Sequence, residues 1–271
     1  MTTPTRGRSR RRWIIDLAVV AVGIVLGAVL FATVTRDNDT PPLEASAEPL
    51  LPDLIMEPIK RLKPGDPLEG GAQSLRFPAT IVNVGAGDFL LESTRSWPWT
   101  DDWKVTQRIQ DATGGYSNHP TTASLVHGGD GHNHWHVRGV EAHTLERVDT
   151  GEVLRKLVKL GFCFYDTDYL YPELPRSPTE EQYLGEACEG PFTTGQVVGL
   201  SVGWGDLYPE ALPEQRIDIE GLPAGRYRLR QVADPDNEFV ELDETNNETW
   251  VDFDLTWSGD APSVTIGAHG P

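Results

Sequence analysis

The chain has 271 residues, 38% of them apolar, and its 23 basic and 41 acidic side chains give a net charge of −18. This length predicts one or two domains, and the acidic excess argues against a nucleic-acid partner, because phosphate binding requires clustered Lys and Arg. Residues 1–36 hold six arginines and one acid, a net +5, so residues 37–271 carry −18 − 5 = −23. Such an acidic body attracts cationic substrates and calcium.

The first predicted element is an apolar segment at residues 14–34, which follows a basic tail at residues 1–13. About 20 helical residues span the hydrocarbon core of a bilayer, and the preceding arginines place the N-terminus in the cytoplasm. We therefore expect a single-pass transmembrane helix or signal anchor with the body outside the cytoplasm. A cleaved signal peptide or a twin-arginine signal is the alternative, and cleavage would leave a secreted body. Residues 35–51 have the acidic, Pro-rich composition of a linker.

Short β-rich runs between Gly and Pro residues dominate the rest of the chain, without a sustained helical period. Regularly spaced short strands predict an all-β fold, an antiparallel sandwich or barrel, and we expect an antiparallel β-sandwich with long loops. Residues 93–130 and 167–215 are long enough to be functional or poorly ordered loops, and residues 258–271 are expected to be a flexible C-terminal tail. The predicted strands are 74–84, 88–92, 153–166, 225–233 and 249–257.

The sequence contains two cysteines, Cys163 and Cys188. An even number of cysteines outside the cytoplasm favours a disulfide. Closing a loop of about 25 residues would stabilise the fold by about 3.5 kcal/mol in the chain-entropy model. The alternative is a pair of free, buried thiols.

A histidine cluster is the strongest chemical signal, because six of the seven histidines lie between residues 119 and 143. His132, His134 and His136 alternate, so a strand would direct all three imidazoles to one face. Their outer members are about 13 Å apart along a straight strand, so binding one ion requires a bend. Three imidazoles suit copper(II), zinc or iron(II), and an all-imidazole set favours copper. A polar surface strand that carries histidines is the alternative.

The run His132-Asn133-His134-Trp135-His136 resembles the copper-binding H-x-H-x-H motif of lysyl oxidases. Further matches follow in the family's order. Lys159-Leu160-Gly161-Phe162-Cys163 resembles the K-x-x-F-C motif, whose lysine contributes to a lysyl-tyrosyl quinone cofactor. Another run ends at Tyr208 and is followed by Gln215-Arg216-Ile217-Asp218. It resembles the segment that supplies the tyrosine of the cofactor. The resemblance covers residues 52–257.

The resemblance implies a copper-dependent amine oxidase that converts primary amines, either small amines or protein lysines, to aldehydes with release of ammonia and hydrogen peroxide. Lys159 and Tyr208 would form the quinone, and His143 stands where the family has a proposed general base. Taken alone, these residues are ordinary: a solvated strand lysine, a packed turn tyrosine and a hydrogen-bonded histidine. The chain departs from the animal enzymes at Gly131, where they have a cysteine, and at Arg216, where they have tryptophan.

Residues 241–247 resemble the family's terminal E-x-D-x-x-N-N motif and place several oxygen donors on a short loop. Calcium takes about 6–8 such ligands, backbone carbonyls included. The resemblance implies that the first and last strands are neighbours, which would add ligands from the start of the body. The alternative is an Asx-rich turn. The predicted calcium ligands are Asp53, Leu54 through its carbonyl, Glu241, Asp243, Asn246 and Asn247.

Two other functions compete with an amine oxidase. One is a non-enzymatic, metal-binding β-sandwich module at the cell surface. The other is a zinc hydrolase that uses the three histidines with a nearby carboxylate as base. The presence of both Lys159 and Tyr208 favours the oxidase, because neither alternative has a use for that pair.

Overall fold

In the computed structural model the folded body belongs to the unit Ser46–Pro271, which is separate from Met1–Ala45. The predicted basic tail, the apolar segment at 14–34 and most of the linker lie outside the described residues. In the described part, no helix is long and apolar enough to cross a membrane. The structure describes residues 47–68, 70–128, 133–159 and 161–271.

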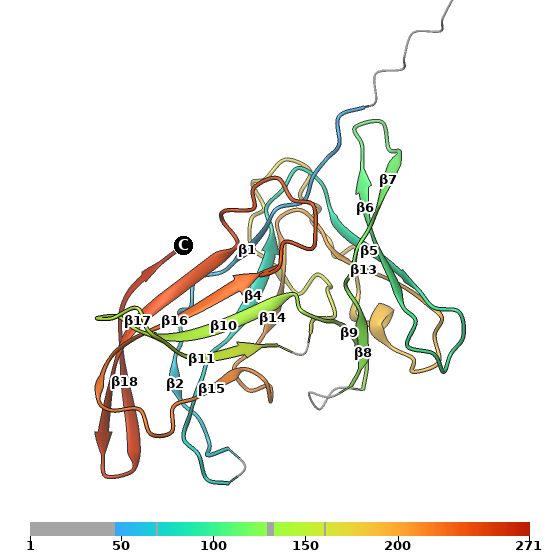
Figure 1. Ribbon diagram of the computed structural model, residues 1–271. Coiled ribbons are helices and arrows are strands. Elements are labelled where there is room, and N and C mark those ends of the chain that lie inside the picture. The colour runs from blue at the N-terminus through green and yellow to red at the C-terminus, as the bar shows by residue number, and fades with distance from the viewer. Residues whose placement is uncertain (1–46, 69, 129–132, 160) are drawn as a thin grey trace, which may run out of the picture. The chain divides into compact units, whose positions relative to one another are not determined.

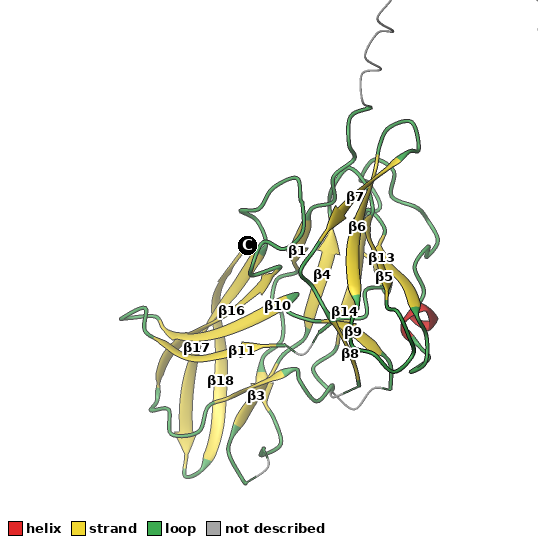
Figure 2. Ribbon diagram, turned by 45° about the vertical axis from the view of Figure 1, so that its right-hand side comes forward, coloured by secondary structure: helices red, strands yellow, loops and turns green. Residues whose placement is uncertain are grey.

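Within these ranges the body is all-β, with eighteen strands and one short 3-10 helix, η1 (Gly185–Cys188). Figure 2 shows strands in yellow, with the single red helix beside β5 and β13. Every pairing between described strands is antiparallel. The predicted all-β, antiparallel class is therefore confirmed.

The largest sheet has five strands and occupies one side of the body in Figure 1. A three-stranded sheet packs against it, and apolar side chains from both sheets form one hydrophobic core. The five-stranded order is β11 (Val153–Val158), β10 (Glu141–Arg147), β16 (Gly225–Ala233), β17 (Glu248–Ser258) and β18 (Ala261–Gly270). The three-stranded order is β15 (Arg216–Asp218), β3 (Ser74–Arg76) and β2 (Lys63–Pro64).

A second core joins two four-stranded sheets and a two-stranded hairpin. One sheet has the order β1 (Leu54–Met56), β4 (Ala79–Asn83), β14 (Trp204–Tyr208) and β12 (Asp168–Tyr169). The other has the order β13 (Gly195–Leu200), β5 (Phe89–Thr94), β6 (Lys104–Gln110) and β7 (Tyr116–Pro120). The hairpin pairs β8 (Leu125–His127) with β9 (Trp135–Val137).

Strand β16 follows the predicted alternation. Tyr227 and Leu229 are buried, while Arg228 on the opposite face donates to the Asp252 carboxylate from Nε at 2.7 Å. Strand β17 buries Val251 and Phe253 in the same core. The predicted run 74–84 divides at Phe77-Pro78 into β3 and β4, which belong to different sheets.

The two segments that we expected to be long loops contain six of the strands. Residues 93–130 include β6, β7 and β8, and residues 167–215 include β12, β13 and β14. The prediction of loops is wrong. Some inward positions of these strands carry polar side chains, so the sequence lacks the apolar alternation by which strands are recognised. Gln107 of β6 is buried and exchanges hydrogen bonds with the backbone of Val240, donating at 2.9 Å and accepting at 2.8 Å.

The predicted flexible tail at 258–271 is also wrong. The chain turns at Gly259, where φ is 59°, and returns as β18 against β17. Most of β18 is exposed, so its sequence lacks the apolar alternation that marks a half-buried strand. The body also starts earlier than predicted, because the Leu50 N–H donates to the Gln110 carbonyl at 2.8 Å.

Candidate active site

Lys159 directly follows β11, and its backbone N–H donates to the Glu141 carbonyl at 3.1 Å. Its side chain is only 2% exposed and points along two aromatic rings. Nζ lies 3.1 Å from the ring centroid of Tyr208 and 3.7 Å from that of Phe162. The structure therefore brings together the two residues that the sequence singled out 49 positions apart.

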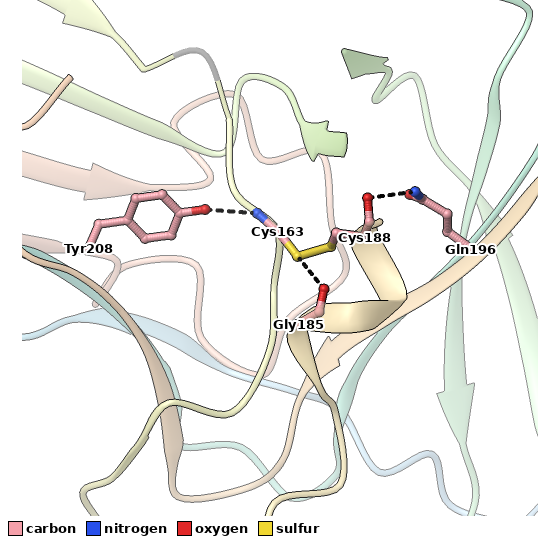
Figure 3. The surroundings of a disulfide bond; sticks show 5 residues. All are labelled: Cys163, Gly185, Cys188, Gln196 and Tyr208. Carbon is pink, nitrogen blue, oxygen red and sulfur yellow. Dashed lines mark hydrogen bonds between the residues drawn. A yellow bond between two sulfur atoms is a disulfide. The ribbon is translucent and has the colours of Figure 1, made fainter. Parts of the chain in front are cut away.

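Tyr208 ends β14 and is buried against Phe162, with ring centroids 4.3 Å apart. Its hydroxyl accepts a hydrogen bond from the Cys163 N–H at 3.1 Å, as Figure 3 shows. The predicted disulfide between Cys163 and Cys188 is confirmed. It ties the segment that follows Lys159 to helix η1, and thereby fixes the backbone group that holds the Tyr208 hydroxyl.

Of the three predicted metal ligands, His134 and His136 are described, and His132 lies outside the described residues. The two described imidazoles have ring centroids 4.5 Å apart, close enough for one ion to contact both. Trp135 between them faces the opposite side, where its ring packs 5.0 Å from Trp103. This alternation matches the prediction for a strand, and the donor set fits copper.

The histidine strand pairs directly with the segment after Lys159. Val137 and Phe162 exchange backbone hydrogen bonds at 2.8 and 3.0 Å. Gly161 permits this approach, since a Cβ there would lie 2.3 Å from the Val137 carbonyl oxygen and 2.8 Å from the His136 Cβ. Phe162 in turn contacts Tyr208. The predicted metal strand and the predicted cofactor residues therefore belong to one site.

Three further ionisable side chains are fully buried around Lys159. Glu141 places Oε2 at 3.8 Å from Lys159 Nζ and Oε1 at 3.5 Å from His143 Nε2. Burial raises the pKa of Glu141 to about 7, although Lys159 opposes the shift. Burial, with help from Lys159, lowers the pKa of His143 to about 3. Burial also raises the pKa of Asp206 well above its usual range.

Glu141 and Asp206 are site residues that the sequence reasoning missed. A signal for Glu141 was available, since it precedes His143 by two positions on β10 and so shares its inward face. His143 itself, the predicted base, is buried with its ring edge-on to Phe77 at 4.9 Å. At neutral pH it is an uncharged imidazole beside a carboxyl group of much higher proton affinity.

A cavity of about 380 Å³ lies beside this site, and Lys159 forms part of its wall. The Lys159 amine itself is enclosed by protein. The wall also carries two acidic side chains, Asp236 and Glu238, and one basic side chain, Arg138. The surface next to Lys159 is therefore partly acidic.

The predicted calcium residues form a second cluster, in which the start of the body meets residues 241–247. The Leu54 N–H donates to the Glu241 carboxylate, and Asn246 donates to Asp53 at 3.0 Å. Asn247 donates to Glu241 at 3.1 Å. The first strand and the last motif are therefore neighbours, as the resemblance implied. Burial raises the pKa of Asp53 and raises that of Glu241 to about 8.

This acidic cluster differs from the prediction in two respects. Asp234 and Glu244, which the sequence reasoning missed, have carboxylate oxygens within 4.8 Å of a Glu241 oxygen and of each other. Asp243, which was predicted as a ligand, is exposed and accepts hydrogen bonds from the N–H and hydroxyl of Thr245 at 2.9 and 2.6 Å.

Comparisons with known proteins agree with this arrangement. Residues 130–265, just over half of the chain, match the family model described as lysyl oxidase. Human "Protein-lysine 6-oxidase" is 30% identical over 67% of this chain and 34% of its own length. Human "Lysyl oxidase homolog 3" is 27% identical over 66% of this chain and 18% of its own. Bovine "Lysyl oxidase homolog 2" is 24% identical over 67% of this chain and 18% of its own length.

The fold and the site thus define a member of a known family: the chain belongs to the lysyl oxidase family. It covers about a third or less of the length of these relatives.

Proposed function

We propose that the chain is a copper-dependent amine oxidase that uses a quinone formed from Lys159 and Tyr208. The observation that carries this proposal is the position of Lys159 Nζ, 3.1 Å from the ring centroid of Tyr208. A zinc hydrolase has no chemical step that uses such a pair. Proximity of the amine to the ring is what a covalent bond between the two side chains requires.

The proposed copper ligands are His132, His134 and His136. The 4.5 Å separation of the His134 and His136 rings and the pairing of their strand with Phe162 support a metal beside Tyr208. When bound, copper supplies the activation of dioxygen that oxidises the tyrosine ring. The chain itself holds the ring by its hydroxyl through the Cys163 N–H and holds the amine over the ring.

The overall reaction is R–CH2–NH2 + O2 + H2O → R–CHO + NH3 + H2O2. Quinone cofactors act as electron sinks for such amine oxidation. His143, at the predicted position of the base, is proposed to act in substrate oxidation as one member of a proton-accepting pair. Its neighbour Glu141, at 3.5 Å, has the higher pKa of the two, so a proton taken up by the pair rests on the carboxyl group.

The proposed substrate is a cationic primary amine, either a small amine or a protein lysine. The cavity at Lys159 is lined by Asp236 and Glu238, and residues 37–271 carry the net charge of −23 derived above from the sequence. Both features favour the approach of a cation.

We also propose that residues 14–34 anchor the chain in a membrane with the body outside the cytoplasm. The disulfide between Cys163 and Cys188 supports this placement, because disulfides persist in oxidising compartments. Calcium is the proposed ligand of the cluster around Asp53 and Glu241, because its buried oxygen donors are of the type that calcium prefers.

The deciding experiment compares wild type with Lys159→Ala after exposure to copper and air. Wild type is expected to yield one peptide species that contains both Lys159 and Tyr208, to stain as a quinone, and to release peroxide from a primary amine. Lys159→Ala is expected to lose all three signals and to keep its copper, because Lys159 is not a ligand. Lys156→Ala, which removes an exposed lysine from the same strand, is the matched control and should behave as wild type.

Two results would contradict the proposal. Peroxide release that persists in Lys159→Ala would remove this cofactor from the reaction. Separate, unmodified peptides in copper-loaded wild type without activity would favour the alternative, a non-enzymatic metal-binding module.

A further inference from the structure

Glu141 is the nearest carboxylate to Lys159 that the structure records as an ion pair, with 3.8 Å between Oε2 and Nζ. Both side chains are almost completely enclosed, with exposures of 0% and 2%. A carboxylate enclosed in this way loses its hydration, which is unfavourable unless partners compensate for it. Buried ionisable groups of this kind are concentrated at functional sites, so the Glu141 carboxylate is a candidate for a chemical role.

Joining Lys159 to Tyr208 creates a need for a proton acceptor. A lysine nitrogen that bonds to a ring carbon must lose a proton, and the Lys159 amine is enclosed by protein. The nearby imidazole of His143, whose pKa is about 3, is a poor acceptor. Burial raises the pKa of Asp206 well above its usual range, which disfavours its carboxylate form.

We infer that Glu141 is the proton acceptor in the formation of the Lys159–Tyr208 bond, an inference that rests on the proposed function. The Glu141 carboxylate takes one proton from the Lys159 ammonium group, and the freed nitrogen lone pair forms the N–C bond to the oxidised ring. The ring gains two electrons, and its oxygens take up a second proton from the nitrogen and the proton of the ring carbon. Dioxygen, the oxidant of the proposed function, removes these two electrons and two protons from the ring and leaves as hydrogen peroxide.

The placement of Glu141 makes this role specific. Backbone pairing holds it, since the Lys159 N–H donates to its carbonyl at 3.1 Å, so acceptor and amine move together. The ionisable groups that face its carboxylate are Lys159 and His143, with Asp206 and Glu214 also acting on the cluster. The amine also contacts the rings of Tyr208 and Phe162.

The pH dependence follows from the pKa of Glu141, which burial raises to about 7. Below that pH the carboxyl group already holds a proton and cannot take the one from Lys159. The joining rate is therefore expected to fall about tenfold for each unit below pH 7 and to level off above it.

The test follows formation of the bond and not amine oxidation. Wild type, Glu141→Gln and Glu141→Asp are loaded with copper, exposed to air between pH 5 and 9, and digested. Mass spectrometry then gives the fraction of oxidised Tyr208 that is joined to Lys159. Gln keeps the shape of the side chain and an oxygen near the amine, but it takes up no proton. At neutral pH the joined fraction in Glu141→Gln is expected to form about 100-fold more slowly, with no inflection near pH 7, while Glu141→Asp recovers part of the rate and keeps the inflection.

Asp252→Asn is the matched control, because Asp252 is a buried carboxylate on β17 that pairs with Arg226 and Arg228. It should join the two residues at the wild-type rate and with the wild-type pH profile. A joining rate in Glu141→Gln that equals wild type would overturn the inference and leave the proposed function intact. If that variant does not fold, a wild-type rate that is constant between pH 5 and 9 would overturn it equally. Absence of joining in copper-loaded wild type would overturn both.

Discussion

The Lys159 amine lies in surroundings that lysines avoid. Lysine is among the residues least often buried, yet this one is 2% exposed and its nitrogen contacts two aromatic rings and a carboxylate. The carboxylate and the rings compensate for lost hydration. The Lys159 amine is thus the centre of the site, and the role proposed for the neighbouring histidines depends on it.

At the same scale we predict that His134→Ala and His136→Ala each abolish tight copper binding. Each imidazole supplies one of three proposed protein ligands, and two ligands hold the ion far more weakly than three. Metal analysis of purified, copper-loaded protein checks the prediction. His119→Ala is the control, since His119 belongs to the same histidine-rich stretch but lies on β7 and contacts Ser117 at 3.1 Å. Full copper content in a variant that lacks both His134 and His136 would contradict the metal site.

Among the elements, the strands with regular alternation were predictable and the others were not. Strands β16 and β17 bury every second side chain, so their sequence alone gave close bounds. Strand β6 was missed because an inward position holds Gln107, which only the distant Val240 backbone satisfies. Strand β18 was missed because it is mostly exposed. Alternation of apolar and polar residues marks a strand that has one buried, apolar face. It does not mark a strand whose buried side chains are polar or a strand that is mostly exposed.

The site shows the same limit. The resemblance supplied Lys159, Tyr208 and the histidines, because each stands in a recognisable local motif. Glu141 was missed although its spacing from His143 on β10 offered a local signal. Asp206 was missed because it lies on β14, which belongs to a different sheet. The packing of the sheets brings Asp206 to the same amine, and no local pattern encodes that packing.

For the loop at 241–247 we predict that calcium raises the melting temperature, because a ligand that binds only the folded state stabilises it by mass action. Chelation should reverse the increase. Glu241→Gln should remove the response to calcium, because Glu241 contacts both Leu54 and Asn247 at the centre of the cluster. Thermal unfolding with and without calcium checks this. Asp149→Asn, at the exposed turn after β10, is the control, and an unchanged calcium response in Glu241→Gln would disprove the assignment.

For the whole molecule we predict a fixed orientation in the membrane. A protease added to intact cells should degrade the body from residue 47 onward and leave a tag at the N-terminus protected. The expectation rests on the five arginines before residue 14 and on the positive-inside rule. Permeabilised cells, in which the tag should also be lost, provide the control. Full-length chain that resists the protease in intact cells and is recovered in the soluble cytosol would refute both the anchor and the orientation.

The bonds that join the two ends of the body also set the order in which it can be completed. Leu54 and Asp53 receive their partners Glu241 and Asn246 from 187 and 193 residues further along the chain. A ribosome adds about 5–20 residues per second, so the first strand waits roughly 10 to 40 seconds for the groups that satisfy it. During this interval β1 can pair with β4, but the bonds from Glu241 and Asn246 cannot form. The contact between the two ends of the body is therefore among the last that the nascent protein can complete.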